Sequence, residues 1–228
     1  MKMQRADLET CAQASGIVVV IDVLRAFSTA AYAFAAGVDS IFLVSTVEEA
    51  LALRQAIPGS LAMGEVYGMR LPEFDFGNSP PQFDGLDLRG RILIQRTTAG
   101  TQGVVRSQKA DLLIPASFCT ARATVELVNR ADPAELTFVL TGLREDGWGD
   151  EDAACADYME ALINGESPEM EPLFERVRSS TPGRQFTNPN LPDFPLQDLE
   201  YCLQVDRFPF AMQVERQDGW HILRQVFP

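Results

Sequence analysis

The run IVVVI at residues 17–21 is the feature that most constrains how this chain can fold. Five consecutive β-branched residues without polar alternation are typical of a strand that is buried on both faces, as in a parallel sheet. Parallel strands need a crossover connection, which is usually a helix. The alanine-rich segment 26–36 supplies one and ends before Gly37, a residue suited to a helix C-terminus.

Strand and helix patterns continue to alternate as far as residue 163. The other predicted strands are residues 40–44, 61–64, 91–95, 111–116 and 136–140. The other predicted helices are residues 46–56, a short stretch ending near residue 108, 117–130 and 151–163. Thr46 and Glu49 form a capping-box pair at the start of the first of these. This rhythm predicts an α/β fold with three α/β/α layers around a largely parallel or mixed central sheet.

The 228 residues suit a single domain, with a core over about 15–165 and a C-terminal extension over about 166–228. Prolines and charges increase in the extension, and its patterns are weak. Its last part predicts a β-hairpin that turns at Asp218-Gly219. This hairpin is a candidate contact for a homodimer.

Charge and composition exclude several classes of partner. The net charge of −13 disfavours nucleic acid and anionic membranes. The N-terminus has no signal-peptide pattern and no apolar run is long enough to cross a membrane, so we expect a cytoplasmic protein. The four cysteines are far apart and have no histidine near them, which predicts neither a zinc site nor a disulfide framework.

Polar side chains gather where the predicted strands end. Ligands of open parallel sheets bind beyond the carboxyl ends of the strands, so residues that follow the strands share one edge. These residues are Asp22, Arg25, Glu65, Arg96, Thr97, Thr98, Gly100, Thr101, Ser117, Thr141, Gly142 and Arg144, followed by Asp150, Glu151 and Asp152. Carboxylates suit Mg²⁺, and arginine and hydroxyl groups suit an oxyanion. The long irregular stretch 65–90 adds a loop of the kind that is usually functional.

Each of these residues also has a purely structural interpretation. Asp22 can cap the helix that follows it, and Glu151 and Asp152 suit the positive end of a helix without any further role. Other chemistries lack their motifs: the only histidine is His221, and the chain has no G-x-S-x-G, no G-x-G-x-x-G after the first strand and no Walker loop. The convergence of several polar residues favours the functional interpretation.

Five blocks of sequence occur in an order that resembles one family. They are IDVLRAFSTA, GEVYGMRLPEFDFGNSP, RTTAGT, ASFCTA and GDEDAACADYM. In this order they resemble the 2-phosphosulfolactate phosphatase (ComB-like) family, over roughly the first three quarters of the chain. The resemblance implies a three-layer α/β/α fold and a Mg²⁺-dependent phosphatase. Its implied reaction releases sulfolactate from a small phosphorylated, sulfonated acid on a route to coenzyme M.

The resemblance also implies roles for individual residues. The catalytic candidates are Asp22, Arg25 and Glu65. The candidates for binding substrate or phosphate are Arg70, Asn78, Ser79, Thr97, Thr98, Gly100, Thr101 and Ser117. The candidates for holding Mg²⁺ are Asp22, Asp75, Glu151 and Asp152.

Two positions depart from the family pattern. Val66 stands where an arginine is usual, and Ala99 where the threonine loop often has asparagine. The loss of an arginine near an anionic site weakens or changes substrate preference. Two alternatives therefore stay open: a phosphatase of the same scaffold for another small phosphorylated acid, and a non-catalytic homologue that binds anions.

Overall fold

The chain has the α/β fold that the sequence predicts. A computed structural model describes residues 1–142 and 149–228. Its strands are β1 (Lys2–Ala6), β2 (Gly16–Ile21), β3 (Ser40–Val44), β4 (Leu61–Gly64), β5 (Ile92–Arg96), β6 (Ala110–Ala116), β7 (Glu135–Leu140), β8 (Ala211–Gln217) and β9 (Trp220–Val226). Its α-helices are α1 (Ala26–Ala35), α2 (Val47–Ala56), α3 (Gly100–Arg106), α4 (Ala121–Ala131), α5 (Asp150–Ile163), α6 (Met170–Ser179), α7 (Thr181–Gln185) and α8 (Leu196–Cys202). Short 3₁₀ turns cover Cys11–Gln13, Pro80–Phe83 and Phe118–Thr120.

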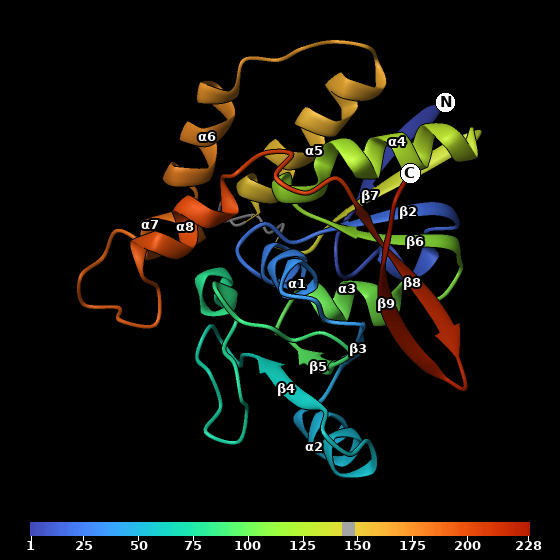
Figure 1. The fold of residues 1–228 in the computed structure, drawn as a ribbon. Coiled ribbons are helices and arrows are strands. Elements are labelled where there is room, and N and C mark those ends of the chain that lie inside the picture. The colour runs from blue at the N-terminus through green and yellow to red at the C-terminus, as the bar shows by residue number, and fades with distance from the viewer. Residues whose placement is uncertain (143–148) are drawn as a thin grey trace.

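The strands form two hydrogen-bonded sheets. One has the order β1-β7-β2-β6 and is parallel throughout. The other has the order β4-β5-β3-β9-β8, in which β9 and β8 run antiparallel. Helices α1 and α3 lie between the strands of the two sheets in Figure 1. The carboxyl ends of β2 and β7 lie side by side because Ile21 pairs with Leu140.

The β-branched run in β2 is buried on both faces. Val18 and Val20 belong to a core cluster with α1, α3 and residues of the second sheet. Ile17, Val19 and Ile21 belong to another cluster with α4 and α5. A polar residue at any of these positions would face a helix layer rather than water, which explains why the run lacks alternation.

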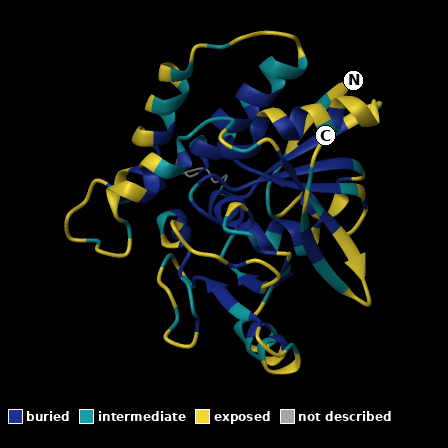
Figure 2. Cartoon of the chain, in the orientation of Figure 1, coloured by how far each residue is buried: buried dark blue, intermediate teal, exposed yellow. Residues whose placement is uncertain are grey.

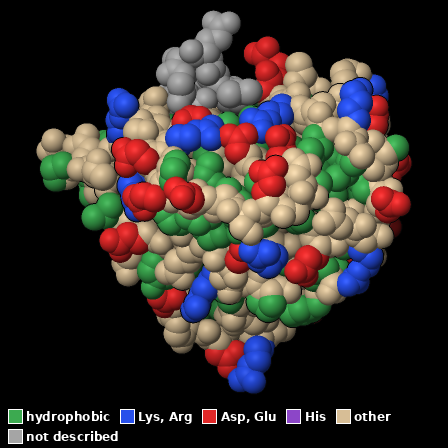
Figure 3. All heavy atoms as spheres, turned by 90° about the horizontal axis from the view of Figure 1, so that it is seen from above, with side chains coloured by type: hydrophobic (Ala, Val, Ile, Leu, Met, Phe, Trp, Pro, Cys, Tyr) green, Lys and Arg blue, Asp and Glu red, His purple; other side chains and the backbone are tan. Residues whose placement is uncertain are grey.

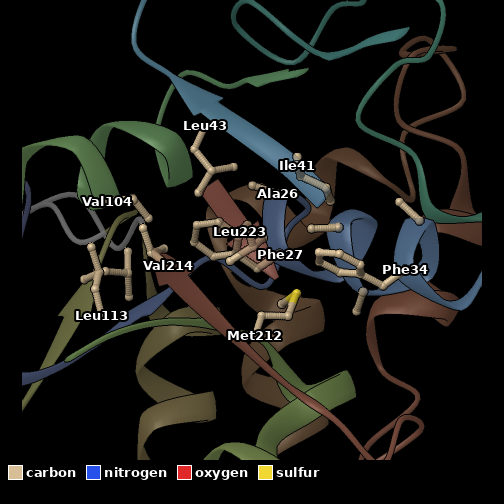
Figure 4. Close-up of a cluster of buried hydrophobic side chains, with 14 of the residues drawn as sticks. Ala26, Phe27, Phe34, Ile41, Leu43, Val104, Leu113, Met212, Val214 and Leu223 are labelled. Atoms are coloured by element: carbon tan, nitrogen blue, oxygen red, sulfur yellow. The ribbon is translucent and has the colours of Figure 1, made fainter. Parts of the chain in front are cut away.

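The larger core cluster joins the two sheets. Figure 4 shows Phe27 of α1, Leu43 of β3 and Val104 of α3 near residues of β6, β8 and β9. A third, smaller cluster packs α2 against the outer face of the second sheet. The strands and α1 are the most continuously buried elements in Figure 2, whereas α6 and the tip of the hairpin are partly exposed.

The C-terminal hairpin is confirmed and belongs to the core. It turns at Asp218 (φ 52°) and Gly219 (φ 84°), the positive angles that a tight two-residue hairpin requires. Strand β9 pairs antiparallel with β3, and Leu223 is fully buried in the larger cluster. The last third of the hairpin is therefore separated from β3 in sequence but adjacent to it in space.

Several local predictions are also confirmed, and some elements were not predicted. The Thr46–Glu49 capping box is present at the start of α2. The sequence did not predict β1, α6, α7 or α8. Strand β1 is a partly exposed edge strand with the sequence KMQRA, and this provides little apolar signal.

The surface and the helix lengths bear on possible partners. On the part of the surface that Figure 3 colours, Lys and Arg side chains are interspersed with Asp and Glu and do not merge into a basic patch. Among the described residues, no helix combines the length and the apolar character needed to span a bilayer.

We expect Leu223→Ala to lower the free energy of unfolding by about 2–5 kcal/mol, because it opens a cavity in a fully buried part of the core. The matched control is Leu196→Ala, at a leucine that is 51% exposed, which we expect to change stability by less than about 0.5 kcal/mol. Urea unfolding monitored by circular dichroism measures both values. Equal, small losses would contradict the assignment of the hairpin to the core.

Candidate functional site

One cavity of about 340 Å³ opens at the carboxyl ends of the parallel strands. It is lined by Asp22, Leu24, Arg25, Glu65, Tyr67, Gly68, Asn78, Thr98, Ala99, Thr141, Gly142, Glu151, Asp152, Pro182, Gln185, Phe186 and Phe194. Residues that follow β2, β4, β5 and β7 thus meet here, as the strand-end rule predicts. The segment 182–194 of the C-terminal extension supplies a further wall.

Asp22 follows β2 directly and has both of the roles that the sequence left open. One carboxylate oxygen accepts a hydrogen bond from the Ala26 backbone N–H at 2.9 Å, so the side chain caps α1. The residue is only 7% exposed and also lines the cavity. A Cβ on Gly100 would lie 2.7 Å from the other oxygen, so the lack of a side chain at Gly100 leaves room for this carboxylate.

Glu65 follows β4 and is tied to the threonine loop after β5. Its carboxylate accepts hydrogen bonds from the backbone N–H and the hydroxyl of Thr98 and from the backbone N–H of Gly68. These bonds hold two loops that are 33 residues apart in sequence at one wall of the cavity. Because three donors already satisfy it, Glu65 is a well-ordered carboxylate.

Glu151 and Asp152 lie in the first turn of α5, and both are buried. Asp152 accepts hydrogen bonds from the backbone N–H of Val23 at 2.9 Å and of Gly142 at 3.0 Å. The Oε2 atom of Glu151 is buried and has no hydrogen-bond partner among the described residues. An unpartnered carboxylate oxygen is costly to bury, so this atom is suited to a ligand.

The carboxylates raise one another's pKa values. Burial, together with the charge of Glu65, raises the pKa of Asp22 to about 6. Burial, together with the charge of Asp22, raises the pKa of Glu151 to about 7. Burial and the charges of Glu151 and Asp22 raise the pKa of Asp152 as well. A cation bound in the cavity would favour the ionised forms.

Arg25 is the one basic residue among the described residues that line the cavity, and it already has a carboxylate partner. It is 4% exposed and forms an ion pair with Asp198, which is fully buried. It also donates to the backbone oxygens of Asp193 and Gly68, each at 3.0 Å. The charge of Arg25 is thus balanced by Asp198, which leaves the cavity carboxylates without a neighbouring basic side chain.

The FDFGNSP loop is only partly at the cavity. Asn78 lines it, and its side-chain oxygen is buried without a partner among the described residues. Ser79 does not line it but donates to the second oxygen of Asp198 at 2.7 Å. Asp75 lies outside the lining, and its carboxylate accepts from Arg54 and from the backbone N–H of Ala62, both at 2.8 Å. The structure therefore does not bring this predicted Mg²⁺ ligand to the cavity.

Other predicted residues support the cavity without lining it. Thr97 and Thr101 are buried and hydrogen-bonded to each other, which fixes the loop that carries Thr98. Arg70 is exposed and donates to backbone oxygens of Phe74 and Asp75. Ser117 is fully buried outside the lining. Arg144 lies outside the described residues.

The sequence interpretation missed the wall formed by the extension, and it missed Tyr67. Pro182, Gln185, Phe186 and Phe194 lie in short elements without helical or strand periodicity, so no pattern placed them. Tyr67 has a positive φ of 53°, which is uncommon for a residue with a side chain. Of these, only the two phenylalanines in a proline-rich stretch offered a signal, and that signal is weak.

The donors at the cavity fit a hard cation. Among residues 1–142 and 149–228, no three His, Cys, Asp or Glu side chains are gathered closely enough to form a ready metal cluster. Mg²⁺ needs fewer, because it usually binds through one or two carboxylates together with water and substrate oxygens. The unpartnered oxygen of Glu151 beside Asp22 and Asp152 meets that requirement.

Comparison with known proteins decides the family. A sequence profile described as 2-phosphosulpholactate phosphatase matches residues 3–217. The chain belongs to the 2-phosphosulpholactate phosphatase family. This places it among the phosphoric monoester hydrolases, as its motifs predict. The match also runs through most of the C-terminal extension, which corrects the expectation that the resemblance ends after three quarters of the chain.

Individual relatives agree with the profile. A protein of Bacillus subtilis (strain 168) named "Probable 2-phosphosulfolactate phosphatase" is 33% identical over 202 residues, covering 88% of this chain and 87% of the relative. A protein of the same name from Carboxydothermus hydrogenoformans is 33% identical over 213 residues, covering 89% and 87%. One from Deinococcus radiodurans is 34% identical over 139 residues, covering 60% and 58%.

For this phosphatase-family chain without added metal, we expect the free energy of unfolding to fall as pH rises from about 4 to about 7. The reason is that Asp22 and Glu151 hold their protons more tightly in the folded state, with pKa values of about 6 and about 7, than in the unfolded chain. Their contribution is complete below the unfolded values and is lost as pH rises through the folded ones. Urea titrations in EDTA at several pH values measure this dependence.

The variant Glu151→Gln isolates the effect from that of the other acidic residues. It cannot ionise at this position, so its stability should fall less steeply over the same pH range. A pH dependence identical to that of the parent protein would show that Glu151 does not titrate as its burial requires.

Proposed function

We propose that this chain hydrolyses the phosphate ester of a small organic acid in the cavity, with 2-phosphosulfolactate as the preferred substrate. The net reaction adds water across the P–O ester bond: phosphorus gains the water oxygen, and the leaving oxygen takes a proton. The products are sulfolactate and phosphate, and sulfolactate would serve a route to coenzyme M. Family membership and the names of the relatives support this choice.

The observation that carries the proposal is the set of buried carboxylates without a free cation. Asp22, Glu151 and Asp152 influence one another's ionisation, and Glu151 has an unpartnered buried oxygen. A site of this kind repels an anionic substrate unless a metal ion is bound with it. Phosphatases that use a divalent ion need this combination.

Mg²⁺ is the cofactor that we propose, held by Asp22, Glu151 and Asp152. When bound, it would supply Lewis acidity at a phosphoryl oxygen. The role of the protein is to hold these carboxylates in place: the backbone N–H of Ala26 orients Asp22, and those of Val23 and Gly142 orient Asp152. Glu151 is the member of the set that keeps an oxygen available.

Other residues would bind and orient the substrate. Thr98 is held by Glu65 at the wall of the cavity, so its position is fixed before a ligand enters. Asn78 has an unpartnered amide oxygen in the lining, which a hydroxyl group or a water next to the substrate would satisfy. The apolar side chains of Phe186 and Phe194 restrict water on the remaining side.

A second substrate in the same class is favoured by one residue. Ala99 lines the cavity, whereas Val66 does not. Of the two departures from the family pattern, only Ala99 therefore changes the surface that a substrate meets. A methyl group there removes a polar contact, which supports another small phosphorylated acid as the alternative substrate.

We expect phosphate release from 2-phosphosulfolactate to require Mg²⁺ and to stop in EDTA. Asp22→Asn should lower kcat/KM by about 100-fold or more, because it removes a charged ligand from the proposed metal set. A phosphate-release assay with 2-phosphosulfolactate, and with 2-phospholactate as an analogue without the sulfonate, measures both rate and preference. Undiminished hydrolysis by metal-free Asp22→Asn protein would sink the proposal, and tight binding without turnover in the parent would favour an anion-binding role.

The matched control is Asp75→Asn, which makes the same chemical change at a carboxylate outside the lining. We expect this variant to keep its Mg²⁺ dependence and most of its activity. If it lost activity as Asp22→Asn does, Asp75 would return to the ligand set that the sequence resemblance implies.

A further inference from the structure

Asp198 connects three parts of the chain at a point behind the cavity wall. It lies in α8 of the C-terminal extension and has no exposed surface. One of its oxygens pairs with Arg25, which follows β2, and the other accepts from the Ser79 hydroxyl at 2.7 Å. Because both oxygens are engaged, the orientation of this carboxylate is fixed.

The bonds to Arg25 use one side of its guanidinium group. Nη1 donates to Asp198 and to the Asp193 backbone oxygen, and Nη2 donates once, to the Gly68 backbone oxygen. A guanidinium group has five N–H donors, so Nε–H and one N–H of Nη2 have no acceptor among the described residues. Those two N–H groups form the edge that binds planar or tetrahedral oxyanions in a bidentate manner.

Aromatic rings further restrict the group. The Arg25 guanidinium carbon lies 5.3 Å from the centre of the Phe186 ring and 5.0 Å from that of Phe194. Both rings come from the extension and line the cavity together with Arg25. The extension therefore determines which edge of the guanidinium group remains available at the cavity.

We propose that Asp198 is a positioning residue, which holds Arg25 so that its Nε–Nη2 edge meets an anionic group of the substrate. This inference rests on the proposed function and adds a residue that touches no substrate itself. Arginine has a flexible side chain, and ordering it before binding removes that cost from the binding step. The extension thus contributes to substrate affinity through Arg25 as well as through its own lining residues.

A role in stability alone explains the arrangement less well. A buried ion pair often contributes little net stability, because desolvation offsets the attraction between the charges. Here the pair lies at a cavity wall and leaves a bidentate edge of the arginine free. A group that only stabilised the fold would not need to leave that edge available.

The test is a double-mutant cycle with Mg²⁺ and 2-phosphosulfolactate. We expect Asp198→Asn to raise KM about tenfold with a smaller change in kcat, since a charge-assisted bond that orients Arg25 is lost. In an Arg25→Lys background, which lacks the fork, the same substitution should leave KM unchanged. Equal effects of Asp198→Asn in the two backgrounds would overturn the proposal, because Asp198 would then act independently of Arg25.

Two further variants separate positioning from folding. Asp206→Asn removes a carboxylate that pairs with Arg122 and Tyr158 away from the cavity, and it should lower stability without raising KM. If Asp198→Asn does not fold, Ser79→Ala replaces it: this variant keeps the ion pair but frees one oxygen of Asp198, and KM should rise about two- to threefold, again only when Arg25 is present. An unchanged KM in Ser79→Ala would then count against the proposal.

The two proposals fail in different ways. If the parent protein does not hydrolyse 2-phosphosulfolactate or another small phosphorylated acid with Mg²⁺, the proposed function is wrong. If the parent is active and the cycle is additive, the proposed function stands and the positioning role of Asp198 is wrong.

Discussion

Several carboxylates share a poorly solvated cavity in this protein, and the one arginine in its described lining is neutralised from behind by Asp198. This imbalance of charge is the constraint on which the site depends. It explains why Asp22, Glu151 and Asp152 hold protons more strongly than isolated carboxyl groups do. It also explains why backbone N–H groups rather than basic side chains orient them. A metal ion would complete the balance without requiring any of these groups to move.

The fold could be predicted from sequence where apolar patterns were strong. The unbroken β-branched run of β2, the capping box of α2 and the Asp218-Gly219 turn each have a local physical cause, and each is confirmed. The division of the strands into two sheets with α1 and α3 between them was not predicted. Which strands pair depends on contacts between distant segments, such as β3 with β9, and local patterns do not encode these.

The site was predictable to the extent that strand ends determine it. Asp22, Glu65, Thr98, Glu151 and Asp152 follow strands or begin a helix beside one, and all line the cavity. Asp75 and Arg70 were placed by resemblance in an irregular loop, where no strand fixes the direction of a side chain, and neither lines it. The wall at Phe186 and Phe194 could not be predicted because the extension has no periodic pattern. Its position follows from packing on Arg25 and on the loop of Gly68.

The pairing of β9 with β3 has a consequence for how the protein is made. Strand β3 covers Ser40–Val44, near the start of the chain, whereas its neighbour β9 covers Trp220–Val226, at the end. During synthesis the N-terminal part emerges first. The edge of β3 must therefore wait, unpaired, until translation is nearly finished, and the same holds for Arg25 and its partner in α8. A growing chain on the ribosome consequently has neither a closed core nor a complete site, so catalytic competence begins only after the last residues have been released.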